Sequence, residues 1–142
     1  MYDAATAAVE AVQMANRVTR KGKTILSGAL HPHYRETIET HGKFSGFEVA
    51  SLAAHVDGLA GIATRLDAKP ACVVVQYPTV FGRLQDLRAL AAACQKNGAL
   101  LIVAIPEIVS MGAVVPPGEM GADIVVAEGQ SIGNALNFGG PY

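Results

Sequence analysis

The chain has 142 residues, of which 51% are hydrophobic, and this length and composition exclude a disordered protein and favour one globular domain. Eleven basic and twelve acidic residues give a formal net charge of −1, so we expect neither a nucleic-acid partner nor an anionic membrane surface. No apolar run has the length of a membrane span, and the first residues do not resemble an export signal, so we expect a cytoplasmic protein with two reduced cysteines.

The first half of the chain alternates helix patterns with strand patterns. Residues 2–20 are rich in alanine, Val9 and Val12 fall at helical spacing, and Asp3 can cap the helix. The β-branched run 24–30 then predicts a strand. Further along, the patterns predict a helix over 31–41, a strand over 47–53, a short helix over 56–66 and a strand over 71–77.

The second half contains one amphipathic helix pattern and two apolar runs. Leucines at three-residue spacing predict a helix over 83–97, and Gly98 stands where glycine is favoured after a helix end. The runs 99–105 and 123–127 are continuously apolar, which is typical of parallel strands covered on both faces. A Pro/Gly-rich loop over 114–121 separates them. We therefore predict an α/β protein: one domain over 1–142, built as a three-layer sandwich around a mostly parallel sheet.

Familiar catalytic motifs are missing or incomplete. Gly22-Lys23-Thr24 looks like the end of a phosphate-binding loop, but Arg17 stands where its first glycine belongs. No dinucleotide-binding glycine motif follows a predicted strand, and no serine or cysteine has the context of a nucleophile. The four histidines lack metal-ligand spacing, so we interpret them as surface or helix-capping residues and expect no metal.

Polar residues that follow three predicted strands are the remaining candidates. Ligands of open α/β sheets bind where the strands end, so residues 76–78, 106–107 and 128–131 should line one crevice. The turn that opens the first helix, at residues 4–6, could offer backbone N–H groups to an anion. On spacing alone, ordinary loop polars and an ordinary helix start are the favoured interpretation of these residues, and a freestanding module that binds a small anion is an alternative.

Four segments, in order along the chain, resemble one family. They are MYDAATAA (1–8), VVVQYPTVFG (73–82), PPGEMGADIVVAEGQSIG (116–133) and FGGPY (138–142). Together they resemble subunit 1 of glycine dehydrogenase (decarboxylating), the P-protein of the glycine cleavage system. The resemblance implies part of the large domain of a fold type I enzyme that uses pyridoxal phosphate (PLP), and hence a fragment of a longer subunit.

The resemblance also implies a reaction and a division of labour. The family enzyme decarboxylates glycine and transfers the aminomethyl group to the lipoyl group of H-protein, with PLP as the electron sink. Such an enzyme needs a lysine for the resting imine and an acid opposite the pyridine nitrogen. Alignment with the family pattern places the lysine position at Gln130 or Ser131 and the acid position at Ala104. We therefore expect no catalytic residue and no cofactor in this chain, and PLP in the partner, subunit 2.

By the same resemblance, the chain is inactive alone and works in a hetero-oligomer with subunit 2 and H-protein. Candidates for facing the partner or the crevice are Tyr2, Asp3, Thr6, Glu128, Gln130, Ser131 and Asn137. The family pattern has glycine where this chain has Ala4, and a methyl group there would hinder close approach of a phosphate. A rival reading, retained PLP catalysis, requires a usable lysine, and all five lysines fall at predicted helix or loop positions away from the strand end.

Overall fold

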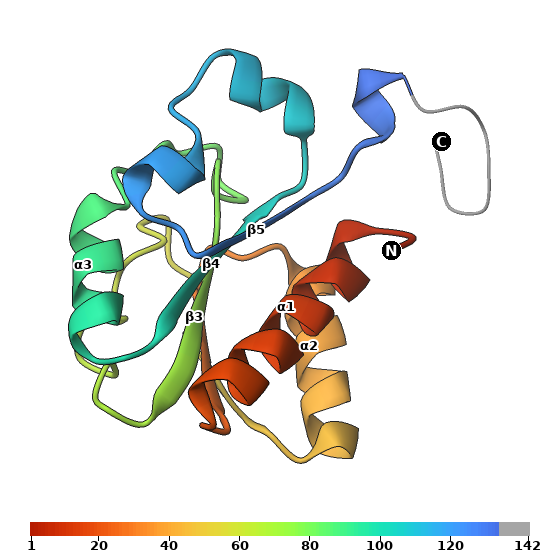
Figure 1. Cartoon of the computed structure of the whole chain (residues 1–142). Coiled ribbons are helices and arrows are strands. Elements are labelled where there is room, and N and C mark those ends of the chain that lie inside the picture. Colours follow the sequence, from red (N-terminus) through yellow and green to blue (C-terminus); the bar gives the residue numbers. More distant parts are fainter. Residues whose placement is uncertain (134–142) are drawn as a thin grey trace.

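The computed structural model describes residues 1–133, so the predicted site residue Asn137 lies outside the described part. Its centre is a parallel sheet in the order β2-β1-β3-β4-β5, flanked by helices (Figure 1). The strands are Lys23–Leu26 (β1), Glu48–Ser51 (β2), Pro70–Gln76 (β3), Leu100–Ile105 (β4) and Ile124–Ala127 (β5). The helices are Ala4–Thr19 (α1), Pro32–Ser45 (α2) and Arg88–Lys96 (α3), with 3-10 turns Ile108–Gly112 (η1), Pro117–Met120 (η2) and Gln130–Ile132 (η3).

The sheet is covered on both faces, which confirms the predicted α/β sandwich with a parallel sheet. On one face, α1 and α2 pack over a core that includes Val12, Val74 and Ile102. On the other face, α3 packs over a second core that includes Val73 and Leu101. Because neighbouring residues of one strand point to opposite faces, a doubly covered strand must be apolar throughout, and β3 is buried at all seven positions.

Two predicted helices differ from the structure. Residues 56–66 form successive turns rather than a helix, because glycines interrupt them and Gly61 has a φ of +73°. The helix predicted over 83–97 begins only at Arg88. Its expected first turn belongs instead to a loop in which the Thr79 N–H donates to the Arg83 carbonyl (3.0 Å) and the Arg83 N–H donates to the Thr79 hydroxyl (3.1 Å).

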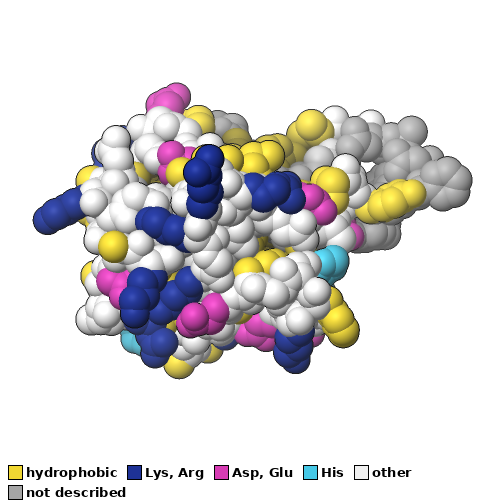
Figure 2. Space-filling model, turned by 60° about the horizontal axis from the view of Figure 1, so that its bottom comes forward, with side chains coloured by type: hydrophobic (Ala, Val, Ile, Leu, Met, Phe, Trp, Pro, Cys, Tyr) yellow, Lys and Arg dark blue, Asp and Glu magenta, His cyan; other side chains and the backbone are white. Residues whose placement is uncertain are grey.

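Charges of both signs are mixed on the surface. Figure 2 shows lysine and arginine side chains next to aspartate and glutamate side chains on the face it displays, with no extended region of one sign. Among residues 1–133, no helix combines the length and the apolar character that crossing a membrane requires.

Candidate functional site

A crevice of about 610 Å³ lies at the carboxyl edge of the sheet, beyond the ends of β4 and β5. Four segments surround it: the starts of α1 and α2, and the residues that follow β4 and β5. The lining residues are Asp3, Ala5, His31, His33, Tyr34, Thr37, Pro106, Glu107, Glu128, Gln130 and Ser131. Strand ends thus meet helix starts here, as they do at ligand sites of open α/β sheets.

Four of the predicted site residues come together around this crevice: Asp3, Glu128, Gln130 and Ser131. Thr6 does not line it, because its N–H (2.7 Å) and its hydroxyl (3.0 Å) both donate to the Asp3 carboxylate. Tyr2 is largely exposed to solvent and lies outside the lining. The role of these residues remains a prediction, but four of them share one place in the fold.

The segment 76–78 was expected to line the crevice, and this expectation is wrong. Gln76 is buried, its amide oxygen accepts the His31 N–H (2.8 Å), and its amide nitrogen donates to the Pro78 carbonyl (3.0 Å). Gln76 therefore lies beneath the site and holds the start of α2 in place.

Sequence reasoning missed the contribution of α2 to the lining. His31 and His33 line the crevice, and Nδ1 of His31 accepts the His33 N–H (3.2 Å), which makes His31 the cap of α2. The capping interpretation of His31 is thus correct, but its place in the crevice was not foreseen. The signal that could have found it is the parallel-sheet rule itself, since the segment after β1 also ends at this edge.

The start of α1 is already occupied by carboxylates from the chain itself. Helix starts carry backbone N–H groups that have no partner within the helix. Here the Ala4 N–H donates to the Glu128 carboxylate, and the Thr6 N–H donates to the Asp3 carboxylate (2.7 Å). Two of the three N–H groups at the predicted anion position, residues 4–6, therefore already have partners within the molecule.

Glu107 holds the segments after β4 and β5 together. Its carboxylate accepts the Val109 N–H (3.0 Å) and the Ser131 hydroxyl (2.8 Å), which joins η1 to η3. These two hydrogen bonds, the backbone one first, hold the pKa of Glu107 below its ordinary value because they stabilise the ionised form. At neutral pH Glu107 is thus ionised, and the Ser131 hydroxyl donates to its carboxylate.

The electrostatics of the crevice are anionic. Asp3, Glu107 and Glu128 contribute three carboxylates, and no lysine or arginine is among the lining residues within 1–133. A doubly charged phosphate ester would therefore meet repulsion from several sides. This arrangement counts against the alternative of a module that binds a small anion.

PLP does not fit the residues of this crevice. The predicted lysine position offers the amide of Gln130 or the hydroxyl of Ser131, and neither can form an imine. The predicted acid position, Ala104, is 0% exposed within the core on the α1 face, so its methyl group offers no charge to a pyridine nitrogen.

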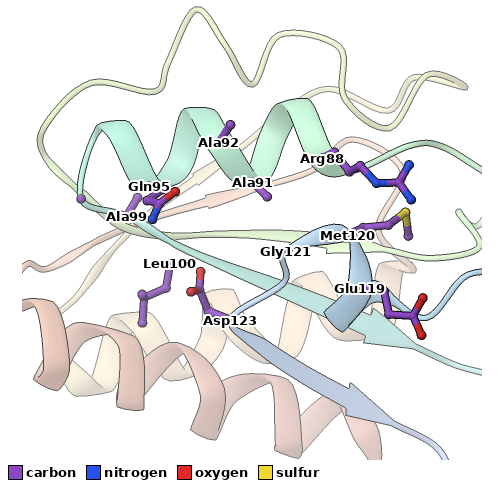
Figure 3. A pocket seen from close by; sticks show the side chains of 11 residues that line it. Arg88, Ala91, Ala92, Gln95, Ala99, Leu100, Glu119, Met120, Gly121 and Asp123 are labelled. Carbon is purple, nitrogen blue, oxygen red and sulfur yellow. The ribbon is translucent and has the colours of Figure 1, made fainter.

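A second concavity, of about 600 Å³, lies at the opposite edge of the sheet, between α3 and η2 (Figure 3). Ala91 and Gly121 both line it and lie close together, since a Cβ on Gly121 would be 2.9 Å from the Ala91 Cβ, and Arg88 and Glu119 stand near one end (Figure 3). Its polar groups serve structural bonds: the Asp123 carboxylate accepts the Leu101 N–H (2.7 Å), and Arg88 pairs with Asp86 (2.9 Å). In the part of the chain that the structure describes, no cluster of His, Cys, Asp and Glu could hold a metal ion, here or elsewhere.

Comparison with known proteins places the whole chain in one group. Residues 1–142 match the family model of the glycine cleavage system P-protein. The chain is 56% identical to the probable glycine dehydrogenase (decarboxylating) subunit 1 of Methylocella silvestris, over all of this chain and 32% of the relative. The chain thus spans about a third of the length of such relatives.

Solved structures agree with this placement. The crystal structure of a glycine decarboxylase (P-protein) in inhibitor-bound form matches with a TM-score of 0.84 and 34% identity, covering all of this chain and 32% of that one. A cystathionine gamma-lyase from Lactobacillus plantarum, complexed with L-serine, matches with a TM-score of 0.61 and 19% identity, covering 84% of this chain and 31% of that one. The second likeness concerns the fold alone, which is that of the large domain of fold type I PLP-dependent enzymes.

Proposed function

The chain belongs to the glycine cleavage system P-protein family, and we propose that it acts as part of a non-catalytic subunit 1. In this role it pairs with subunit 2, which carries PLP, and the complex decarboxylates glycine and passes the aminomethyl group to the lipoyl group of H-protein. The relatives' name, subunit 1, supports assembly with another subunit. The two buried, unpaired cysteines support a reducing compartment, the cytoplasm.

The observation that carries the proposal is the chemistry of the crevice. A chain with the fold of PLP-dependent enzymes presents carboxylates, an amide and a hydroxyl at the edge where such an enzyme needs an amine. The fold is that of such an enzyme, and the lining residues within 1–133 include no lysine. A supporting role beside a catalytic subunit accounts for both facts.

We further propose that residues 1–142 form one structural unit within the longer subunit, and that the carboxyl edge of its sheet faces the partner. At the carboxyl edge of the sheet, the polar crevice residues lie next to exposed apolar residues of η1 and η3, the two turns that Glu107 connects. Ile132 of η3 is 67% exposed, and Val109 of η1 is 55% exposed. Exposed apolar side chains rimmed by polar ones are typical of protein interfaces.

The first experiment tests the non-catalytic role. The purified chain is incubated with PLP, reduced with borohydride and mapped by peptide mass spectrometry, with subunit 2 as the positive control. We expect no stoichiometric phosphopyridoxyl-lysine in this chain. A single saturable adduct at one lysine, lost on unfolding, would overturn the proposal.

The second experiment tests the partner-facing edge. Tagged subunit 2 is used to capture the chain, and Ile132→Asp is compared with Val18→Asp, since Val18 on α1 has the same 67% exposure. We expect Ile132→Asp to weaken capture by about tenfold or more, because it places a charge in the interface, and Val18→Asp to leave capture unchanged. Equal effects of both substitutions would show that this edge does not face the partner.

A further inference from the structure

Glu128 makes a contact that links the two ends of the described chain. Its carboxylate, at the end of β5, accepts the backbone N–H of Ala4, the first residue of α1 and 124 positions away in sequence. Ala4 is 0% exposed, so this N–H has no access to water in place of the carboxylate. The Glu128 backbone N–H donates to the Ile105 carbonyl (3.0 Å), so the side chain projects from a backbone fixed to β4.

The position that this carboxylate occupies is one that suits an anion. The first N–H groups of a helix lack partners within it, and the helix dipole places partial positive charge there. Phosphates and carboxylates both bind at such ends. In this chain Glu128 supplies the anion from within, and the Asp3 carboxylate accepts the Thr6 N–H of the same turn.

We propose that Glu128 is a built-in occupant of the anion position at the start of α1 and that it closes this crevice to PLP and other phosphate monoesters. An incoming phosphate would have to displace a carboxylate from the Ala4 N–H. It would then lie against the remaining carboxylates of Asp3 and Glu107, with no lysine or arginine in the lining to offset them. The choice of PLP as the excluded ligand rests on the proposed function, whereas the contact of Glu128 with the Ala4 N–H does not.

The contact also explains why Glu128 follows the apolar strand β5 although no catalytic motif surrounds it. The side chain after β5 serves as a cap for the helix that begins the chain. Substitution of a reactive lysine alone would leave the anion position at the start of α1 open. Here the Glu128 carboxylate occupies that position and connects α1 to the end of β5.

The test uses pyridoxine 5′-phosphate and pyridoxine, which differ by the phosphate and carry no aldehyde, so that imine formation plays no part. Binding to the full chain is measured by titration calorimetry for the unmodified protein, Glu128→Ala and Glu119→Ala. Glu119 is the matched control, because it is an exposed glutamate at the opposite edge of the sheet.

We expect the unmodified chain and Glu119→Ala to show no preference for the phosphorylated compound. Glu128→Ala should bind pyridoxine 5′-phosphate about tenfold or more tightly than the unmodified chain does, with competition by inorganic phosphate. The proposal is overturned if the unmodified chain already prefers the phosphate ester. It is equally overturned if folded Glu128→Ala shows no gain.

A second measurement does not depend on the folding of Glu128→Ala. In the unmodified chain, the amide proton shift of Ala4 should follow the titration of one carboxylate, and this dependence should disappear in Glu128→Gln. An Ala4 amide that does not respond to pH would refute the contact. Subunit 2 is absent from both measurements, so a negative result in them refutes the role of Glu128 and not the pairing with subunit 2. The non-catalytic role is tested separately, by the search for a lysine adduct with PLP.

Discussion

Ala104→Asp restores, at the predicted acid position, the type of residue that PLP catalysis requires, and we expect it to destabilise the chain. Ala104 lies in β4 between Gln76 of β3 and Val126 of β5, is 0% exposed and belongs to the core on the α1 face. The only polar neighbour in register, Gln76, already uses its amide on His31 and Pro78. A carboxylate at this site therefore finds no free partner among these neighbours.

The magnitude follows from the pKa of the new acid. An aspartate has a pKa of about 3.9 in the unfolded chain, and full burial raises it by roughly 4 units or more, so the folded protein keeps it mostly protonated at pH 7. Because folding then requires uptake of one proton, the free energy of unfolding falls by about 4 kcal/mol at pH 7. At pH 5 this loss in the free energy of unfolding is only about 1.5 kcal/mol, because the loss grows as the pH rises above the pKa of aspartate in the unfolded chain.

Urea unfolding at pH 5 and pH 7 measures this difference, with Ala104→Val as the control for added volume. Both substitutions enlarge the side chain, but only the aspartate should show a penalty that rises with pH. If Ala104→Asp and Ala104→Val differ by less than about 1 kcal/mol at pH 7, the acid has found solvent or a partner. The crevice would then reach residue 104, and an acid there would be accessible to a ligand in the crevice.

Three further predictions concern the scaffold. Gly28→Ala should lower the free energy of unfolding by about 3 kcal/mol, because a Cβ there would lie 2.0 Å from a backbone carbonyl oxygen. A Cβ on Gly22 would meet no atom within 4 Å, so Gly22→Ala should change the free energy of unfolding little in the same urea titration. Lys21→Ala should cost about 1 kcal/mol, since Nζ donates to two carbonyls at the end of α3 (3.1 and 2.7 Å), and unfolding curves with and without the substitution measure this. Burial raises the pKa of the Cys72 and Cys94 thiols to about 12, so neither should react with a thiol reagent at pH 8 until urea unfolds the chain; rapid reaction of the native chain would contradict their burial.

The sheet could be predicted from sequence because its strands are doubly buried. Continuous apolar runs such as 99–105 are typical of a parallel strand between two layers, and the structure places β4 there. The turns over 56–66 could not be predicted by the same rule. Their apolar residues have helical spacing, but the conformation of Gly61 overrides that spacing.

The crevice was predicted in part for a similar reason. Parallel strands all end at one edge, so the grouping of Glu107 with Glu128 follows from topology once the strands are known. The bond from Ala4 to Glu128 does not follow, because no pattern in a single sequence pairs a helix start with a side chain 124 positions away. The role of Gln76 was missed because a buried amide that bonds backbone groups looks, in sequence, like any polar residue at a strand end.

The negative charge of the crevice does not suit a cofactor that carries a phosphate. An enzyme that loses its reactive lysine by substitution alone would retain the positive potential that once held its cofactor. This crevice instead carries three carboxylates, and each one accepts a hydrogen bond from the chain's own N–H groups. These bonds hold the three carboxylates in place, and those of Glu107 also keep its pKa below the ordinary value. At this edge, carboxylates of the chain therefore bind segments of the chain to one another, which is consistent with the partner-facing role proposed for it.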